Sequence, residues 1–144
     1  MARKARAVAA GVPHHVTQRS SGGRDIFSCE GDRELYLDLI FRQARRYLVR
    51  IWGYCLMRDH VHFLVEPFLS NSLARAFGHA HGEYARYQNL RQQRVERFWK
   101  GRFASCAVAE DQAWAVLAYI ENNPVRADLA GSAEDYRWSS AFGL

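Results

Sequence analysis

The chain has few cysteines, few prolines and no long hydrophobic run. Its three cysteines are scattered and form no CxxC pair, which argues against a disulfide framework or a zinc knuckle and is typical of reduced thiols. No segment approaches the roughly 20 apolar residues of a membrane span. The apolar stretch after the basic start is too short for a secretory signal. We therefore expect a soluble, cytoplasmic protein with no membrane partner.

Apolar side chains and positive charge are, by contrast, plentiful. The 144 residues are 49% hydrophobic and carry a formal net charge of +5. This length is typical of one domain, and such a composition can build a core. We expect a single domain over residues 1–144, in which residues 1–12 form a flexible basic arm. The charge favours a polyanionic partner, most commonly nucleic acid.

Hydrophobic periodicity predicts seven elements in the order β-α-β-β-α-β-α. Asp32 is expected at or near the N-cap of the first helix, and Asp111 at the start of the third. The expected strands cover 14–19, 49–57, 60–67 and 103–108, and the expected helices 32–47, 70–90 and 111–123. This order predicts an α+β fold, a ferredoxin-like split βαβ sandwich with one antiparallel sheet and an extra C-terminal helix that carries Tyr119.

Two histidines, His60 and His62, lie two positions apart in a β-prone run. Side chains alternate across a strand, so both imidazoles point to one face and can hold one metal ion. Val61, Phe63 and Val65 would point to the other face and pack under a helix. The alternative is a strand that carries two histidines without binding metal, and the pair alone does not decide between the two.

A second motif places Tyr119 and Asn123 four positions apart on the third helix, hence on one face. If that face meets His60 and His62, a phenol, an amide oxygen and two imidazoles come together. This set suits attack of a tyrosine hydroxyl on a phosphodiester that a divalent metal polarises and orients. The ligands are comfortable for Mn²⁺ and borderline for Mg²⁺. The alternative for Tyr119 is an ordinary packing role.

The densest basic stretch, residues 86–102, is interleaved with aromatic residues. Its arginines can neutralise phosphates, and rings such as Phe98, Trp99 and nearby Phe103 can stack on unpaired bases. The alternative is a solvated helix end followed by a strand whose aromatic residues belong to the core. The sequence leaves both interpretations open.

Together these motifs resemble the HUH single-tyrosine transposases of insertion sequences and their relatives, the REP-associated tyrosine transposases. The HUH triplet (histidine, hydrophobic residue, histidine) is His60-Val61-His62. The resemblance spans almost the whole chain, in the segments 14–20, 24–27, 57–65, 98–103, 119–127 and 136–140.

The resemblance implies a metal-dependent endonuclease and strand transferase that acts on single-stranded DNA at hairpins or palindromes. Tyr119 would be the nucleophile and form a 5′-phosphotyrosine intermediate. His60, His62 and Asn123 would bind Mg²⁺ or Mn²⁺, although insertion-sequence members usually place the longer glutamine at the position of Asn123. The residues expected to contact DNA are Arg19, Arg97, Lys100, Arg102 and Arg126.

Three alternatives stay open. The protein could be a catalytically inactive, domesticated protein that binds hairpin DNA. It could also be a structural metalloprotein or small-molecule hydrolase built on the two histidines. A monomer and a homodimer are both compatible with the sequence, so the tyrosine would act within one subunit or across two.

Overall fold

The computed structural model describes residues 8–144, and most of the expected basic arm lies outside this range. The predicted order of strands and helices is confirmed, with one short helix added at the end. The elements are β1 (His14–Arg19), α1 (Glu30–Arg46), β2 (Val49–Leu56), β3 (His60–Pro67), α2 (Ser72–Arg91), β4 (Ala104–Ala107), α3 (Ala113–Glu121) and α4 (Asn123–Arg126), with 3-10 turns at Ser21–Gly23, Glu110–Gln112 and Ala133–Asp135.

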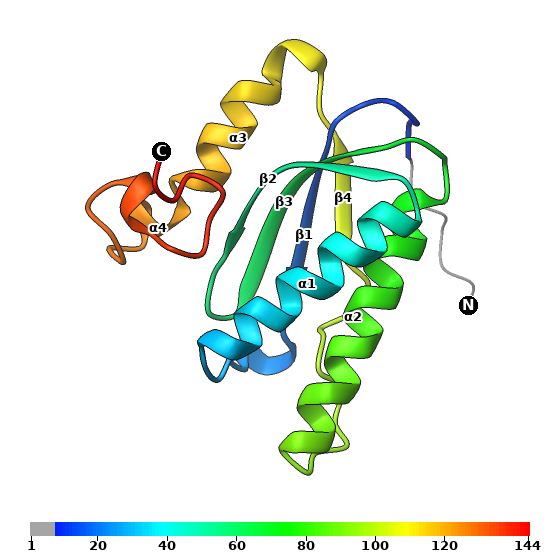
Figure 1. The fold of residues 1–144 in the computed structure, drawn as a ribbon, viewed down its shortest axis with the longest axis vertical. Helices are drawn as coiled ribbons and strands as arrows, with labels where there is room; N and C mark the ends of the chain where they lie inside the picture. Colours follow the sequence, from blue (N-terminus) through cyan, green and yellow to red (C-terminus); the bar gives the residue numbers. More distant parts are fainter. Residues whose placement is uncertain (1–7) are drawn as a thin grey trace.

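The four strands form one antiparallel sheet in the order β2-β3-β1-β4. Helices α1 and α2 pack together on one face, while α3 packs on the other face over β2 and β3 (Figure 1). The predicted α+β, ferredoxin-like sandwich with an additional C-terminal helix is therefore confirmed.

The larger hydrophobic core lies between the sheet and the α1–α2 layer. Val61, Phe63 and Val65 point into it from β3 and are completely buried, as their alternation with the histidines predicts. Tyr36 of α1 and Phe77 of α2 meet them from the helix layer. The histidines of β3 consequently point to the opposite face of the sheet, the face that α3 covers.

A smaller cluster holds α3 to the sheet. Ile120 is completely buried in it, against Cys55, Leu64 and Val108. Close approach of the helix depends on Gly53, because a side chain there would overlap Leu117 of α3 and Ser140 of the C-terminal segment. The position of the helix that carries Tyr119 is thus fixed by packing within the same chain.

The strand β2 contains a bulge. Ile51 pairs with Val65 and Gly53 pairs with Leu64, so Trp52 is the extra residue between them. Bulges commonly redirect a side chain out of the regular alternation. Trp52 is accordingly an exposed aromatic residue.

The start of α1 differs from the prediction. The N-cap is Cys29 and the helix begins at Glu30, so Asp32 lies in the first turn. Its carboxylate accepts hydrogen bonds from the backbone N–H of Ser28 at 2.9 Å and from both terminal nitrogens of Arg91, at 2.8 and 2.6 Å. Asp32 therefore joins the start of α1 to the end of α2.

Three further predictions need correction. Residues 8–12 do not form part of a free arm, because Val8 packs against the core and the Gly11 N–H donates to the Pro67 carbonyl at 2.7 Å. The third helix begins at Ala113, after a 3-10 turn that contains Asp111. The fourth strand is shorter than expected.

No helix within residues 8–144 has the length and apolar character needed to cross a membrane.

Candidate active site

His60 and His62 lie side by side on β3, with ring centroids 5.0 Å apart and both side chains half-buried. The Nδ1 of His60 lies 2.8 Å from the Asp59 carboxylate, and the Nδ1 of His62 lies 3.0 Å from the Nε2 of His15. Both Nε2 atoms are left without a hydrogen-bond partner in the described part of the chain. A ring held through one nitrogen with the other nitrogen available is the usual state of a metal-binding histidine.

The surroundings of His62 keep its imidazole neutral. Burial, together with the nearby His60, His15, Arg19 and Arg126, lowers the pKa of His62 to about 3. Burial also lowers the pKa of His15. Because a metal binds the neutral imidazole, His62 is in the form required for coordination at physiological pH.

Tyr119 lies on the flank of α3 that faces the histidine strand. Leu117 and Glu121 occupy the opposite flank, above Gly53 of the edge strand β2, and Ile120 points down between the two flanks. Tyr119 is about 100° around the helix from Ile120, away from β2 and toward β3. Its side chain is 55% exposed, so the ring is accessible from solvent.

Arg126 connects this tyrosine to the histidines. The centre of its guanidinium lies 3.9 Å from the Tyr119 ring centroid, and its Nη2 donates to the Tyr119 carbonyl at 2.6 Å. The same guanidinium is one of the charges that lower the pKa of His62. Arg126 therefore contacts the ring of Tyr119 and also lowers the pKa of His62.

Asn123 is placed differently from the prediction. The helix is interrupted at Asn122, so Tyr119 ends up in α3 and Asn123 opens α4. The Asn123 amide nitrogen donates to the Ile120 carbonyl at 3.3 Å, and the amide oxygen has no partner among residues 8–144. In the same range no three His, Cys, Asp or Glu residues are grouped to hold a metal. A third ligand beside the two histidines would be of another kind, such as this amide oxygen.

The predicted DNA-contacting cations do not all gather in one place. Arg19 pairs with His60 across β1 and β3, and it lines a hollow of about 300 Å³ together with Lys100 and Arg102. Arg97 lines two other hollows near the end of α2, one of them together with Arg102, and Arg126 covers Tyr119. Arg19 is thus the strand neighbour of His60, and Arg126 acts on His62.

Most aromatic residues of the basic stretch belong to the core, and Tyr87 is the exposed exception. Phe98, Trp99 and Phe103 are buried, and the Trp99 indole N–H donates to the His81 carbonyl at 2.8 Å. The interpretation of these three rings as base-stacking residues is wrong, and the packing interpretation is correct.

Sequence reasoning missed two residues that hold the histidines, His15 and Asp59. The signal for Asp59 is its position directly before His60. His15 comes from β1, where it pairs with Leu64, and it stacks on His62 with centroids 5.2 Å apart. Only the register between β1 and β3 reveals this contact.

Comparisons with known proteins identify the family and the fold of this chain. Residues 11–123 match the family model of IS200-like transposases. The structure of a REP-associated tyrosine transposase bound to a REP hairpin is similar, with a TM-score of 0.79, 15% identity, and coverage of 97% of this chain and 82% of that chain. A candidate transposase from Deinococcus radiodurans R1 gives a TM-score of 0.55 at 17% identity, covering 84% of this chain and 97% of that one.

None of the curated proteins matches the chain. The two solved structures share its fold, and the family model covers most of its length. The chain therefore belongs to the IS200-like transposases, a family of HUH single-tyrosine transposases.

Proposed function

We propose that the protein is a metal-dependent endonuclease and strand transferase that acts on single-stranded DNA at hairpins, with Tyr119 as its nucleophile. The observation that supports the proposal is that Arg126 covers the ring of Tyr119 and also lies close enough to lower the pKa of His62. His60 and His62 keep their Nε2 atoms available, and the Tyr119 side chain is exposed.

In the proposed reaction the Tyr119 hydroxyl oxygen bonds to the phosphorus of a backbone phosphodiester. The bond from phosphorus to the 3′ oxygen breaks, the phenol proton passes to solvent, and the departing oxygen takes up a proton to become a 3′-hydroxyl. The 5′ end stays attached to Tyr119. The phosphotyrosine bond keeps the energy needed for a second strand's 3′-hydroxyl to attack it and rejoin the DNA.

The remaining residues have distinct roles in this proposal. His60 and His62 would hold a divalent metal, Mn²⁺ or Mg²⁺, and the Asn123 amide oxygen is the candidate third ligand. When bound, the metal supplies Lewis-acid polarisation of the scissile phosphate. Arg126 offsets negative charge beside the phenol oxygen, because its guanidinium already covers the ring.

The cations around the site suit a polyanionic strand. Arg19, Lys100 and Arg102 line the hollow beside His60, where they would neutralise backbone phosphates. Arg97 would contact phosphates farther along the strand. Hairpin DNA is the proposed substrate because the similar REP-associated transposase was solved with a hairpin.

We further propose that Tyr119 acts on the metal site of its own subunit. The helix α3 packs against β2 and β3 of the same chain, and Ile120 is completely buried in that contact. A single subunit would then contain the full set of reacting groups.

The experiment is a cleavage assay with Mn²⁺ or Mg²⁺ and a panel of labelled single-stranded hairpins drawn from palindromes that flank the gene. We expect a nick and a protein-linked 5′ fragment. Tyr119→Phe and His60→Ala should abolish both products while hairpin binding persists, and Tyr47→Phe is the matched tyrosine control. A hairpin that is bound tightly but is neither cut nor linked by the unmodified protein would refute catalysis and leave a hairpin-binding protein.

A further inference from the structure

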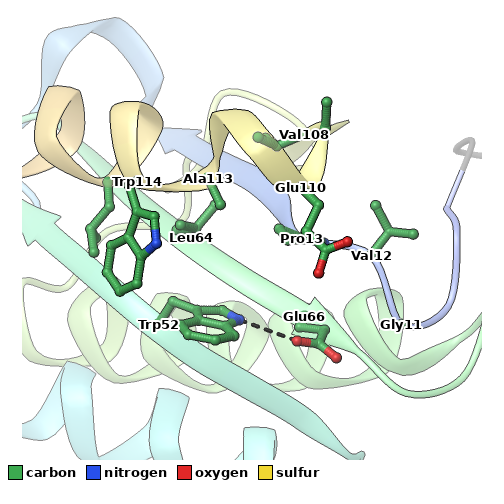
Figure 2. Close-up of a pocket in the computed structure, with 12 residues that line it drawn as sticks. Gly11, Val12, Pro13, Trp52, Leu64, Glu66, Val108, Glu110, Ala113 and Trp114 are labelled. Carbon is green, nitrogen blue, oxygen red and sulfur yellow. Dashed lines mark hydrogen bonds between the residues drawn. The ribbon is translucent and has the colours of Figure 1, made fainter.

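A pocket of about 370 Å³ lies on the α3 face of the sheet (Figure 2). Its walls include Trp52 of β2, Leu64 and Glu66 of β3, and Glu110 and Trp114 at the start of the α3 region. The proposed catalytic residues do not line it. Leu64 follows the histidine pair by two positions, a distance of about 7 Å along the strand. Leu64 itself is buried against Ile120, and the pocket opens on the Leu117 flank of α3, so a DNA strand held at the histidines would pass around α3 to reach it.

Two tryptophans form the open side of the pocket. Trp52 and Trp114 meet edge to face, with ring centroids 6.4 Å apart and an interplanar angle of 82°. They are 42% and 73% exposed, and the Trp114 indole N–H has no partner among the described residues. Trp52 takes this position because it is the extra residue of the β2 bulge. Exposed rings of this kind are the usual platform for stacking a flat aromatic ligand.

The charge of the pocket is opposite to that of the protein. Among the described residues 8–144, Glu66 and Glu110 are the only charged residues that line it, in a chain whose net charge is +5. One Glu66 oxygen accepts the Trp52 indole N–H at 3.3 Å, the dashed line in Figure 2. The other Glu66 oxygen and both Glu110 oxygens have no hydrogen-bond or ion-pair partner within residues 8–144. The pocket therefore offers free acceptors, and Arg50, which pairs with Glu66 across the strands and lies 5.9 Å from the Trp52 ring centroid, is the cation beside it.

We propose that this pocket binds one unpaired nucleobase that carries an amino group, supplied by the same DNA strand that the histidine site processes. The inference rests on the proposed function for its ligand, and it adds a base-reading subsite to it. The ring would stack on Trp114, and its amino N–H groups would donate to Glu66 and Glu110 while the phosphates stay outside.

The acceptors predict which bases fit. Cytosine and adenine each present an amino group, and guanine presents an amino group next to a ring N–H. Thymine has a single ring N–H between two carbonyl oxygens, and a carboxylate repels those oxygens. The pocket should therefore bind cytosine, adenine or guanine in preference to thymine.

The test measures the binding of fluorescein-labelled octamers, (dC)₈ and (dT)₈, by fluorescence anisotropy at one fixed salt concentration. We expect (dC)₈ to bind more tightly. Trp114→Ala should weaken (dC)₈ binding about tenfold, as expected for the loss of one stacked base. Phe142→Ala removes an aromatic residue of similar exposure outside the pocket and should change neither affinity.

The carboxylates are tested by Glu110→Gln, with Glu30→Gln as an exposed charge control elsewhere. Glu110→Gln should raise (dT)₈ affinity and reduce the preference for (dC)₈, whereas Glu30→Gln should leave the ratio unchanged. Equal binding of the two octamers by the unmodified protein would overturn the proposal. So would a Trp114→Ala variant that binds both octamers normally but loses a concentration-dependent dimer, because the pocket would then be a contact between copies.

The two proposals fail in different ways. If the pocket does not read bases, the Glu110→Gln and Trp114→Ala variants still form the Tyr119-linked product with hairpin DNA. If the protein is not a nuclease, no hairpin is cut by any variant, yet the octamer preference and its loss in Glu110→Gln are still measurable by anisotropy.

Discussion

The Nε2 of His15 lies 3.0 Å from the Nδ1 of His62, and the two rings stack with their centroids 5.2 Å apart. This contact fixes the ring of His62 through the nitrogen that a metal would not use. Asp59 has the same relationship to His60. Each proposed metal ligand is therefore oriented by a partner that does not itself bind the metal, an arrangement that commonly strengthens metal binding.

Replacing His15 should weaken metal binding without removing a ligand. We predict that His15→Ala lowers Mn²⁺ affinity by roughly 10- to 100-fold, the usual effect of losing an outer hydrogen-bond partner. Isothermal titration with Mn²⁺ measures this directly. His79→Ala is the control, because His79 stacks on Tyr47 and takes no part in the site. Equal Mn²⁺ affinity in the His15 variant and the unmodified protein would refute the role of His15.

The sequence predicted those parts of the site that depend on spacing within one element. His60 and His62 share a face because side chains alternate along any strand, and this alternation does not depend on the contacts of the strand with the rest of the chain. The contact of His15 with His62 joins two strands, and its existence depends on the pairing register, which no local pattern specifies. Asn123 was misplaced for a similar reason, because the break at Asn122 interrupts the helix one residue earlier than the following proline suggested.

Asp32 should be important for stability. Burial raises the pKa of its carboxyl, but hydrogen bonds from Arg91, Ser28 and Gln88 outweigh burial and lower the pKa well below its usual value. We predict that Asp32→Asn lowers the free energy of unfolding by about 2 kcal/mol, a value that allows for the partial exposure of Arg91.

Urea unfolding at pH 7 measures this loss, with Asp38→Asn as the matched control. Asp38 pairs with Arg42 on the surface, where both side chains are more than half exposed. Such pairs contribute about 0–1 kcal/mol. If the two variants lost the same stability, the buried network around Asp32 would not hold α1 to α2 as described.

The Asp32 network also shows where local signals mislead. An aspartate near a helix start is read as a cap, yet its main partner is Arg91, 59 positions away. Likewise, Phe98 and Trp99 lie in a basic stretch, and only the packed structure shows that they are buried. The bulge at Trp52 changes the alternation in β2, and the hydrophobic pattern gave no sign of it.

Stability should fall in mild acid because of buried histidines. His81 is buried against Tyr36, with its Nε2 2.8 Å from the phenol oxygen, and burial lowers its pKa to about 3. An unfolded histidine binds a proton below about pH 6.5. The unfolded state therefore gains a proton that the folded state does not, so stability is full above pH 6.5 and falls as the pH drops toward 3.

The size of this effect can be measured with one variant. Between pH 6.5 and pH 5, each such buried histidine should lower the free energy of unfolding by about 2 kcal/mol. His62 contributes in the same direction. We predict that His81→Gln loses about 2 kcal/mol less stability than the unmodified protein between pH 7 and pH 5, measured by urea unfolding. An identical loss in both proteins would contradict the buried, neutral state of His81.

Mixing two inactive variants tests whether the tyrosine acts within its own subunit. Tyr119→Phe keeps the histidines, and His60→Ala keeps the tyrosine. Because α3 packs on its own sheet, we predict that an equimolar mixture cuts hairpin DNA no better than either variant alone. Recovery of cleavage in the mixture would show that the tyrosine is donated to a partner subunit.

The most direct test of the account is the identity of the residue that becomes attached to DNA. The protein is incubated with Mn²⁺ and a hairpin that it cuts, digested with trypsin and nuclease, and examined by mass spectrometry. The tryptic fragment 103–126 contains Tyr119 as its only tyrosine. The account predicts a nucleotide on Tyr119 in this fragment, absent from His60→Ala. A cut hairpin with an unmodified 103–126 fragment, or a nucleotide on another residue, would contradict it.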